Sequence, residues 1–317
     1  MFSYANGKFV LTEELALPLK EDITGTIRGF RIFTACRTLP NGRVFRLENH
    51  IDRLFNFAKA VFMELPHDKN KLKEIIQETI IKNKEEGEED KSSSSPFAVA
   101  REGKETSSLL SPRFAREGKE LLLEIIYSGG EANLSGVAPA GKAILYIMVL
   151  PLKMPPARWY EKGIKLAVYP YQRQWPEIKF LNYVGGVIAH QTVVKKYEAD
   201  DALFVSPDEK KIILEGTTFN FFIIKNGLIL THPADGKILP GITRQVALEL
   251  SCQQGIKTKE DYFSLDDLVE VEEAFITSST RNIVPVVRVD DIVIGSGQPG
   301  KITDKLARFF KEYQANY

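Results

Sequence analysis

Cysteine is scarce in this chain of 317 residues, which contains two, Cys36 and Cys252. Two cysteines cannot build the disulfide framework of a small secreted protein, and such scarcity is typical of a reducing compartment. A net charge is lacking as well, because 42 Lys and Arg residues balance 42 Asp and Glu residues. The chain therefore offers no general attraction for nucleic acid or for an anionic membrane surface.

Long hydrophobic runs are also missing. The longest, residues 143–150, is far shorter than the roughly 20 residues that a membrane-spanning helix needs. The first residues, Met-Phe-Ser-Tyr-Ala-Asn-Gly-Lys, contain no apolar core of the kind found in a signal peptide. We therefore expect a cytoplasmic globular protein, of the size of an enzyme, that binds neither nucleic acid nor membranes.

Several common site motifs are absent. The four histidines are scattered and lack metal-ligand spacing with the cysteines: His50, His67, His190 and His232. No metal site is therefore predicted. The segment Gly295-Ser-Gly-Gln-Pro-Gly300 matches G-x-G-x-x-G, but only 17 residues follow it. That remainder is too short to complete a dinucleotide-binding unit, so this reading is set aside.

Hydrophobic periodicity predicts strands and helices that alternate without strict βαβ order. The expected strands are residues 7–11, 28–38, 43–47, 121–127, 143–150, 164–169, 202–205, 212–214, 219–224, 228–231, 273–277 and 284–289. The expected helices are residues 48–65, 68–82, 182–196, 243–254 and 303–313. Asn41-Gly42 and Asn226-Gly227, each between apolar runs, predict two hairpins. This pattern favours an α+β fold in two domains.

Proline and low-complexity sequence divide the chain. We expect a small N-terminal α/β domain at 1–152, a proline-marked linker at 153–160, and a larger β-rich α/β domain at 161–317. Within the first domain, residues 84–120 carry four successive serines and an imperfect repeat of Ala-Arg-Glu-Gly-Lys-Glu. This composition predicts an insertion that builds no core of its own, and no function is assigned to it.

One lysine has unusual neighbours. Lys179 lies between Ile178 and Phe180-Leu181, and Asn182 and Tyr183 follow. A lysine among apolar residues can become a nucleophile, since desolvation disfavours its charged form. The ordinary alternative is a lysine at a strand end whose amine reaches solvent.

Other segments favour the nucleophile when they are taken together. Leu239-Pro-Gly-Ile-Thr-Arg244 places Thr243 at a helix start, where free amides and the helix dipole can hold a phosphate. Thr277-Ser-Ser-Thr-Arg-Asn-Ile-Val-Pro285 places hydroxyls on a turn after a strand, and Glu215 stands where an apolar strand ends. Each segment alone has a mundane reading as a cap, a turn or a surface side chain.

In this order, the motifs H-x-x-R-L, K-x-x-N-Y, E-G-x-x-x-N-x-F, L-P-G-I-T-R and S-S-T…P-V resemble the fold-type IV pyridoxal-phosphate enzymes, the class IV aminotransferases. That group includes branched-chain aminotransferases, D-amino acid aminotransferases and 4-amino-4-deoxychorismate lyase. The resemblance covers nearly the whole chain outside 84–120. It implies the two-domain fold-type IV architecture, a pyridoxal 5'-phosphate cofactor and a homodimer.

The resemblance also implies roles for individual residues. Lys179 would form the Schiff base with the cofactor aldehyde and shuttle the substrate Cα proton. Tyr183 would bond to the ring's phenolic oxygen, and Glu215 would pair with the ring nitrogen. The cofactor phosphate would be held by four residues: Arg53, Ile242, Thr243 and Ser279. The substrate would be met by Phe33, by Arg37, and by Thr280 and Arg281 on the turn that receives its carboxylate.

Substrate choice stays open at this stage. The loop at 128–134 lacks the Arg and His that D-amino acid enzymes place there, and the strand 123–127 lacks the arginine frequent in branched-chain enzymes. Arg37, and after it Arg31, are the remaining candidates for the distal carboxylate of an acidic co-substrate. Tyr183 favours transamination over lyase chemistry. We expect transfer of an amino group between a branched-chain amino acid and a 2-oxo acid such as 2-oxoglutarate; the alternatives are a D-amino acid aminotransferase and a lyase-like enzyme.

Overall fold

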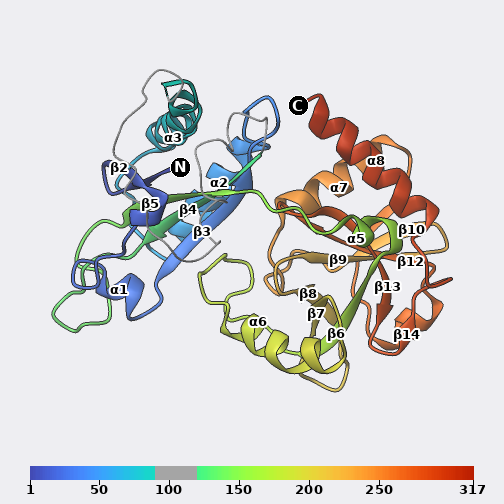
Figure 1. Cartoon of the computed structure of the whole chain (residues 1–317). Helices are drawn as coiled ribbons and strands as arrows, with labels where there is room; N and C mark the ends of the chain where they lie inside the picture. The colour runs from blue at the N-terminus through green and yellow to red at the C-terminus, as the bar shows by residue number, and fades with distance from the viewer. Residues whose placement is uncertain (90–119) are drawn as a thin grey trace, which may run out of the picture. The chain divides into compact units, whose positions relative to one another are not determined.

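The computed structural model describes residues 1–89 and 120–317 (Figure 1), which form two compact units, Met1–Lys153 and Met154–Tyr317. Most of the expected low-complexity insertion lies outside the described residues. Its first residues, 84–89, continue helix α3 (Lys69–Glu89), which is therefore longer than the expected helix. Its last residue, Glu120, pairs with Arg37 and is part of the folded unit.

Unit 1 is built on a five-stranded antiparallel sheet in the order β2-β1-β5-β4-β3. Its strands are β1 (Phe2–Ala5), β2 (Lys8–Leu11), β3 (Arg31–Arg37), β4 (Leu121–Ser128) and β5 (Ile144–Pro151). Its other helical segments are η1 (Thr12–Glu14), α1 (Ile23–Thr26) and α2 (Leu47–Ala60). Helix α2 buries Ile51, Leu54 and Ala58, which recur at helical spacing, and it packs against β3.

The expected strand at 43–47 is wrong. The Asn41-Gly42 turn does form, since the Gly42 amide bonds to the Leu39 carbonyl at 2.7 Å. Only one isolated bridge, Thr38 with Val44, follows it. Arg46 adopts a left-handed conformation with φ of 53°, and Leu47 already begins α2. The chain enters α2 at this point because the apolar face of α2 packs against β3 of the sheet.

Unit 2 contains a sheet whose strands close on themselves. The strand order is β11-β10-β9-β12-β13-β6-β7-β8, β14 pairs with β13, and β8 also pairs with β9. The strands are β6 (Ile164–Pro170), β7 (Asp201–Val205), β8 (Ile213–Gly216), β9 (Asn220–Lys225), β10 (Leu228–Thr231), β11 (Thr258–Glu260), β12 (Glu273–Ser278), β13 (Asn282–Val289) and β14 (Ile292–Val293). The predicted Asn226-Gly227 hairpin is confirmed between β9 and β10. Strands β9, β12, β13, β6, β7 and β8 thus form a closed ring.

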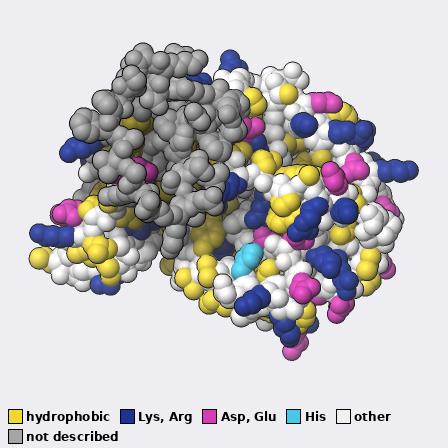
Figure 2. Space-filling model, in the orientation of Figure 1, with side chains coloured by type: hydrophobic (Ala, Val, Ile, Leu, Met, Phe, Trp, Pro, Cys, Tyr) yellow, Lys and Arg dark blue, Asp and Glu magenta, His cyan; other side chains and the backbone are white. Residues whose placement is uncertain are grey.

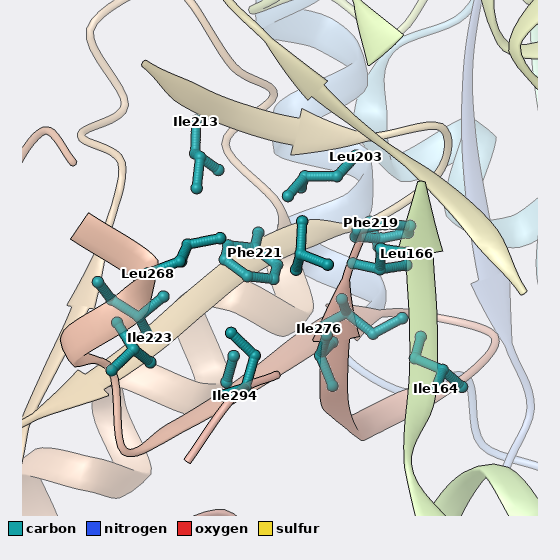
Figure 3. Packing of buried hydrophobic residues seen from close by; sticks show 14 of the residues in the cluster. Ile164, Leu166, Leu203, Ile213, Phe219, Phe221, Ile223, Leu268, Ile276 and Ile294 are labelled. Carbon is teal, nitrogen blue, oxygen red and sulfur yellow. The ribbon is translucent and has the colours of Figure 1, made fainter. Parts of the chain in front are cut away.

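The interior of this ring is apolar (Figure 3). Phe221 and Ile223 on β9 point into it, together with Leu166, Leu203 and Ile276 from neighbouring strands. Each such side chain contributes about 1.5–3 kcal/mol on burial, so the ring is a rigid base for residues at its ends.

Of the helices predicted in unit 2, residues 243–254 form a helix of the expected length, residues 303–313 form part of a longer helix, and residues 182–196 form an irregular one. They are α5 (Ala157–Lys162), α6 (Val184–Ala189), the π-helical turn η3 (His190–Val194), α7 (Ile242–Gln253), η4 (Asp266–Glu270) and α8 (Lys301–Ala315). Helix α5 occupies the end of the expected linker. The expected helix at 182–196 is α6 followed by η3, and π turns of this kind often occur at functional sites.

The surface carries charges of both signs. Figure 2 shows acidic and basic side chains intermingled over the visible face of unit 2, as the balanced composition predicts. Among the described residues, no helix combines the length and hydropathy needed to cross a membrane.

Candidate active site

Lys179 lies in the loop between β6 and α6, and its amine is close to a phenol. Lys179 Nζ donates a hydrogen bond to Tyr183 Oη at 2.8 Å and lies 5.6 Å from the centre of the Tyr183 ring. Both side chains are half-buried, and Ile178 beside the lysine is buried. Since Tyr183 directly precedes α6, the helix start fixes the direction from which the phenol approaches the amine.

Arg173 connects this loop to Glu215 on β8. Arg173 Nε donates to Glu215 Oε1 at 2.8 Å, and Nη2 lies 2.7 Å from the same oxygen. Arg173 Nη1 donates to the Ile178 carbonyl at 3.3 Å, and Nη2 donates to the Pro176 carbonyl at 2.5 Å. The guanidinium therefore holds the backbone immediately before Lys179 against the buried carboxylate.

Glu215 is also tied to the start of α7. Its Oε2 accepts a hydrogen bond from the Leu239 amide at 3.0 Å. Asn220, the register partner of Glu215 across β8 and β9, donates to the Leu239 carbonyl at 2.8 Å. A carboxylate offers about four acceptor positions. The Arg173 guanidinium occupies Oε1 and the Leu239 amide takes one position on Oε2, so one position on Oε2 is left for a further donor.

The N-terminus of α7 suits an anion. The helix begins after Gly241, and Ile242 and Thr243 are both buried. A side chain at position 241 would collide with Asn220, since a Cβ there would lie 2.0 Å from Asn220 Oδ1. Gly241, the residue before the helix, provides no side-chain cap for the first amides of α7.

The glycine-rich segment before α8 lacks such an open end. The carboxylate of Glu273 accepts hydrogen bonds from the Ile302 amide at 3.0 Å and the Thr303 amide at 2.8 Å. A protein carboxylate thus occupies the position that a phosphate would need. This agrees with setting the dinucleotide reading of residues 295–300 aside.

The β12–β13 turn presents unsatisfied hydroxyls. In the described part of the chain, Thr277 Oγ1 and Ser278 Oγ are buried and have no hydrogen-bond partner. Thr277 pairs in register with Asn220 on β9, so the turn lies beside the residues that hold Leu239. Ser279 and Thr280 follow on the same turn and are half-buried. A buried hydroxyl without a partner is costly, and a bound acceptor would relieve that cost.

Arg281, at the end of this turn, points its guanidinium at Asp201. Nη1 lies 2.7 Å from Asp201 Oδ2, and Nη2 donates to Thr218 Oγ1 at 3.0 Å. Asp201 also interacts with His190 Nε2 at 3.0 Å, and Thr217 Oγ1 donates to it at 2.6 Å. Burial alone would raise the pKa of the Asp201 carboxyl, but the hydrogen bonds and the Arg281 charge together lower it. The hydrogen bond with Asp201 raises the pKa of the His190 imidazole.

The three predicted site residues of unit 1 lie on β3 and α2. Phe33 is buried on β3. Arg53 Nη2 donates to Thr34 Oγ1 at 3.0 Å, and His50 Nδ1 contacts the same hydroxyl at 2.7 Å. Arg37 is buried, and its Nε donates to Glu120 at 2.6 Å.

Arg31, the second candidate for a distal carboxylate, is held in a buried ion pair. Its Nη2 lies 2.7 Å from Asp22, which is fully buried, and its Nε donates to Ser128 at 2.8 Å. Asp22 also accepts a hydrogen bond from the Gly130 amide at 3.0 Å. These contacts give Arg31 a structural role in joining β3, β4 and the segment around α1.

Pyridoxal phosphate needs three kinds of protein group: an amine for its aldehyde, a carboxylate for its ring nitrogen, and donors for its phosphate. Unit 2 supplies Lys179, Glu215 with one acceptor position left, and the start of α7 beside orphaned hydroxyls. The residues present therefore fit this cofactor.

Sequence reasoning missed Arg173, Asp201 and His190 as members of this region. Their partners lie 42, 80 and 11 residues away in the chain. No local motif contains such a pair. The arginine and aspartate could have been noted as charges next to apolar strands, but their partners only follow from the tertiary fold.

The chain is similar to known aminotransferases over most of its length. The model of the family described as amino-transferase class IV matches residues 31–289. A protein of Methanocaldococcus jannaschii, provisionally named a branched-chain-amino-acid aminotransferase, is 30% identical over 99% of this chain and 96% of its own length. A D-alanine aminotransferase of Listeria monocytogenes is 27% identical over 92% of both chains.

Solved structures confirm the predicted α+β fold-type IV architecture. The branched-chain amino acid aminotransferase of Escherichia coli superposes with a TM-score of 0.80 at 22% identity, covering 98% of this chain and 93% of that one. The branched-chain aminotransferase of Thermoproteus uzoniensis, solved with norvaline, gives 0.79 at 22% identity over 100% and 95%. With a family match over most of its length and a relative 30% identical over nearly all of it, the chain belongs to the class IV aminotransferases, a family of pyridoxal-phosphate-dependent enzymes.

Proposed function

We propose that this protein is a cytoplasmic aminotransferase that moves an amino group between a branched-chain amino acid and a 2-oxo acid such as 2-oxoglutarate. The observation that carries the proposal is the 2.8 Å contact between Lys179 Nζ and Tyr183 Oη, in a loop that Arg173 holds against Glu215. The name of the M. jannaschii relative, which matches almost the whole chain, supports the branched-chain substrate.

In the first half-reaction Lys179 would take the proton from the substrate Cα as general base and pass it to the cofactor as general acid. In the second half-reaction it would act in the reverse sense and deliver a proton to the Cα of the product amino acid. Tyr183 orients the amine, because its hydroxyl accepts the Nζ hydrogen bond. Glu215 would hold a proton at the cofactor's ring nitrogen through the acceptor position left on Oε2. Bound pyridoxal phosphate would supply the aldehyde and the electron-accepting ring that these groups serve.

The phosphate would be bound by the amides of Ile242 and Thr243 and by hydroxyls of the β12–β13 turn, including Ser279. Arg53 would add a positive charge, and its contact with Thr34 already restricts its orientation.

For the substrate, we assign its carboxylate to the backbone amides of Thr280 and Arg281, since the Arg281 guanidinium is committed to Asp201. The Arg281 amide would exchange its 3.3 Å bond to the Ser278 carbonyl for the carboxylate. Phe33 would contribute an apolar surface. Arg37 would bind the distal carboxylate of 2-oxoglutarate by exchanging Glu120 for it.

Spectroscopy of the purified protein tests the proposal. Addition of pyridoxal phosphate should produce a visible absorption band, and Lys179→Ala should abolish it. The exposed lysine Lys195 provides a matched control, because Lys195→Ala should retain the band. A protein that gains no visible band with added cofactor would refute the assignment of Lys179.

A panel of amino acids tests the substrate. L-leucine, L-isoleucine and L-valine should convert the visible band to the pyridoxamine form faster than D-alanine or D-glutamate. The second candidate, a D-amino acid aminotransferase, is favoured by the similarity to the Listeria enzyme over 92% of the chain. Faster conversion by D-amino acids would establish that candidate instead. Pyruvate release from aminodeoxychorismate without an amino acceptor would establish a lyase.

We also propose a homodimer as the active form. The support is the resemblance to the fold-type IV family, whose active sites include a small-domain loop of a second subunit. Sedimentation combined with an activity assay tests this assembly. Activity should fall as dilution produces monomers, and a fully active monomer would contradict the shared site.

A further inference from the structure

The Asp201 carboxylate connects segments that are distant in sequence. It is 1% exposed at the start of β7. Its Oδ1 lies 3.0 Å from His190 Nε2 and accepts hydrogen bonds from Thr217 Oγ1 at 2.6 Å and the Ala202 amide at 2.8 Å. Its Oδ2 accepts Arg281 Nη1 at 2.7 Å. A buried carboxylate with this many donors is fully compensated, and removing any one partner leaves a deficit.

Two of the connected segments are turns of the candidate active site. Thr217 lies on the turn at 216–219, directly after Glu215. Arg281 ends the turn at 278–281, where its amide bonds to the Ser278 carbonyl at 3.3 Å. Arg281 also donates to Thr218 at 3.0 Å, so the guanidinium contacts both Asp201 and the first turn.

Further contacts hold Arg281, which is half-buried, in place. Its carbonyl accepts a hydrogen bond from Tyr160 Oη at 2.9 Å. Its guanidinium carbon lies 5.5 Å from the centre of the Trp159 ring and 5.9 Å from that of Phe219. A side chain with this many partners has little freedom to move toward a ligand.

We propose that Asp201 is a positioning residue that clamps the turns at 216–219 and 278–281 together, with Thr217 and Arg281 as its two arms. The clamp fixes the amides of Thr280 and Arg281 relative to Glu215 before any ligand arrives. This inference rests on the proposed function for the roles of the two turns. The coupling between the turns requires neither cofactor nor substrate.

Hydrogen–deuterium exchange of the full-length apoprotein tests the coupling. In Asp201→Asn, which keeps the shape but loses the charge, amides at 216–219 and 278–281 should both exchange at least about tenfold faster, since a charge-assisted hydrogen bond is lost on each side. The Asn226-Gly227 turn should exchange at the wild-type rate. The matched control is Asp291→Asn, which removes the charge of an exposed partner of Arg288 and should leave both turns unchanged.

Thr217→Val gives a second test that does not alter the charged pair. This variant removes only one arm, yet it should speed exchange at 278–281, to which Thr217 itself makes no hydrogen bond. If Asp201→Asn fails to fold, Thr217→Val decides alone. Exchange that changes only at 216–219 in Thr217→Val, or at neither turn, would overturn the clamp.

A measurement on the cofactor-loaded enzyme separates the clamp from the proposed function. Asp201→Asn should raise KM for the amino acid more than it lowers kcat, because the substrate carboxylate meets a less ordered turn. If the variants show the coupling but the wild type never gains the visible band, the proposed function fails and the clamp stands. If the band forms and the coupling is missing, the clamp fails alone.

Discussion

Removal of the Arg173 side chain should destabilise unit 2 strongly. Glu215 and Arg173 have side-chain exposures of 7% and 15%, so the pair is largely shielded from water. Loss of one partner of a buried pair costs about 3–5 kcal/mol, since the other charge is left uncompensated. In Arg173→Met, Glu215 would keep the Leu239 amide as a donor, while the carbonyls of Pro176 and Ile178 would lose theirs. We therefore expect a loss of about 4 kcal/mol in the free energy of unfolding.

Urea denaturation of the apoprotein measures this loss, because no cofactor then contributes to stability. The matched control is Arg288→Met, which breaks an exposed pair with Asp291 and should cost less than about 1 kcal/mol. The double variant Arg173→Met with Glu215→Gln should recover part of the loss, since neither charge then remains buried. Equal stability of Arg173→Met and wild type would refute the argument that this pair joins the lysine loop to the sheet.

Three further predictions concern other parts of the molecule. Burial raises the pKa of the Cys36 thiol to about 12, so iodoacetamide at about pH 8 should alkylate exposed Cys252 and spare Cys36 in the folded protein, as peptide mass spectrometry would show. The hydrogen bond to its aspartate partner raises the pKa of His190 above 6.5. The stabilising contribution of this hydrogen bond is therefore complete below the ordinary histidine value and is lost as the pH rises through the higher pKa of the folded state. The stability difference between wild type and His190→Gln should shrink as the pH rises above 6.5; a pH-independent difference would contradict this. Phe221→Ala should cost about 3–5 kcal/mol in urea denaturation, against under about 0.5 kcal/mol for Phe62→Ala, whose side chain is 95% exposed.

The two Asn-Gly turns show how far local sequence determines the fold. At Asn226-Gly227 both flanking segments pair, because β9 and β10 are neighbours in the same sheet. At Asn41-Gly42 the turn forms, but the chain after Val44 is drawn into α2, whose apolar face packs on β3. Turn chemistry is local and could be predicted, whereas the competition between strand and helix was decided by burial against a distant sheet.

In the candidate site, too, residues in local motifs could be predicted, whereas residues with distant partners could not. Lys179, Tyr183 and Glu215 lie in short motifs, so their types and spacing could be read from the sequence. Lys179 and Tyr183 are four residues apart in the chain, and their contact follows from the start of α6. Arg173 and Asp201 act through partners that only the closed sheet brings near, so no spacing in the sequence indicated them.

The backbone of Leu239 connects two parts of the site. Glu215 binds its amide and Asn220 binds its carbonyl, while the chain runs on through Gly241 into α7. Insertion or deletion of one residue within 216–219 or at 240–241 would shift the carboxylate relative to the helix start. The exposed Asn226-Gly227 turn is attached elsewhere, since its two amides bond to the Glu272 carboxylate at 3.1 and 3.5 Å and neither contact involves Glu215 or α7. Sequence change should therefore be tolerated at many positions around Leu239, but a change of loop length should not, and engineered insertions belong in the β9–β10 turn.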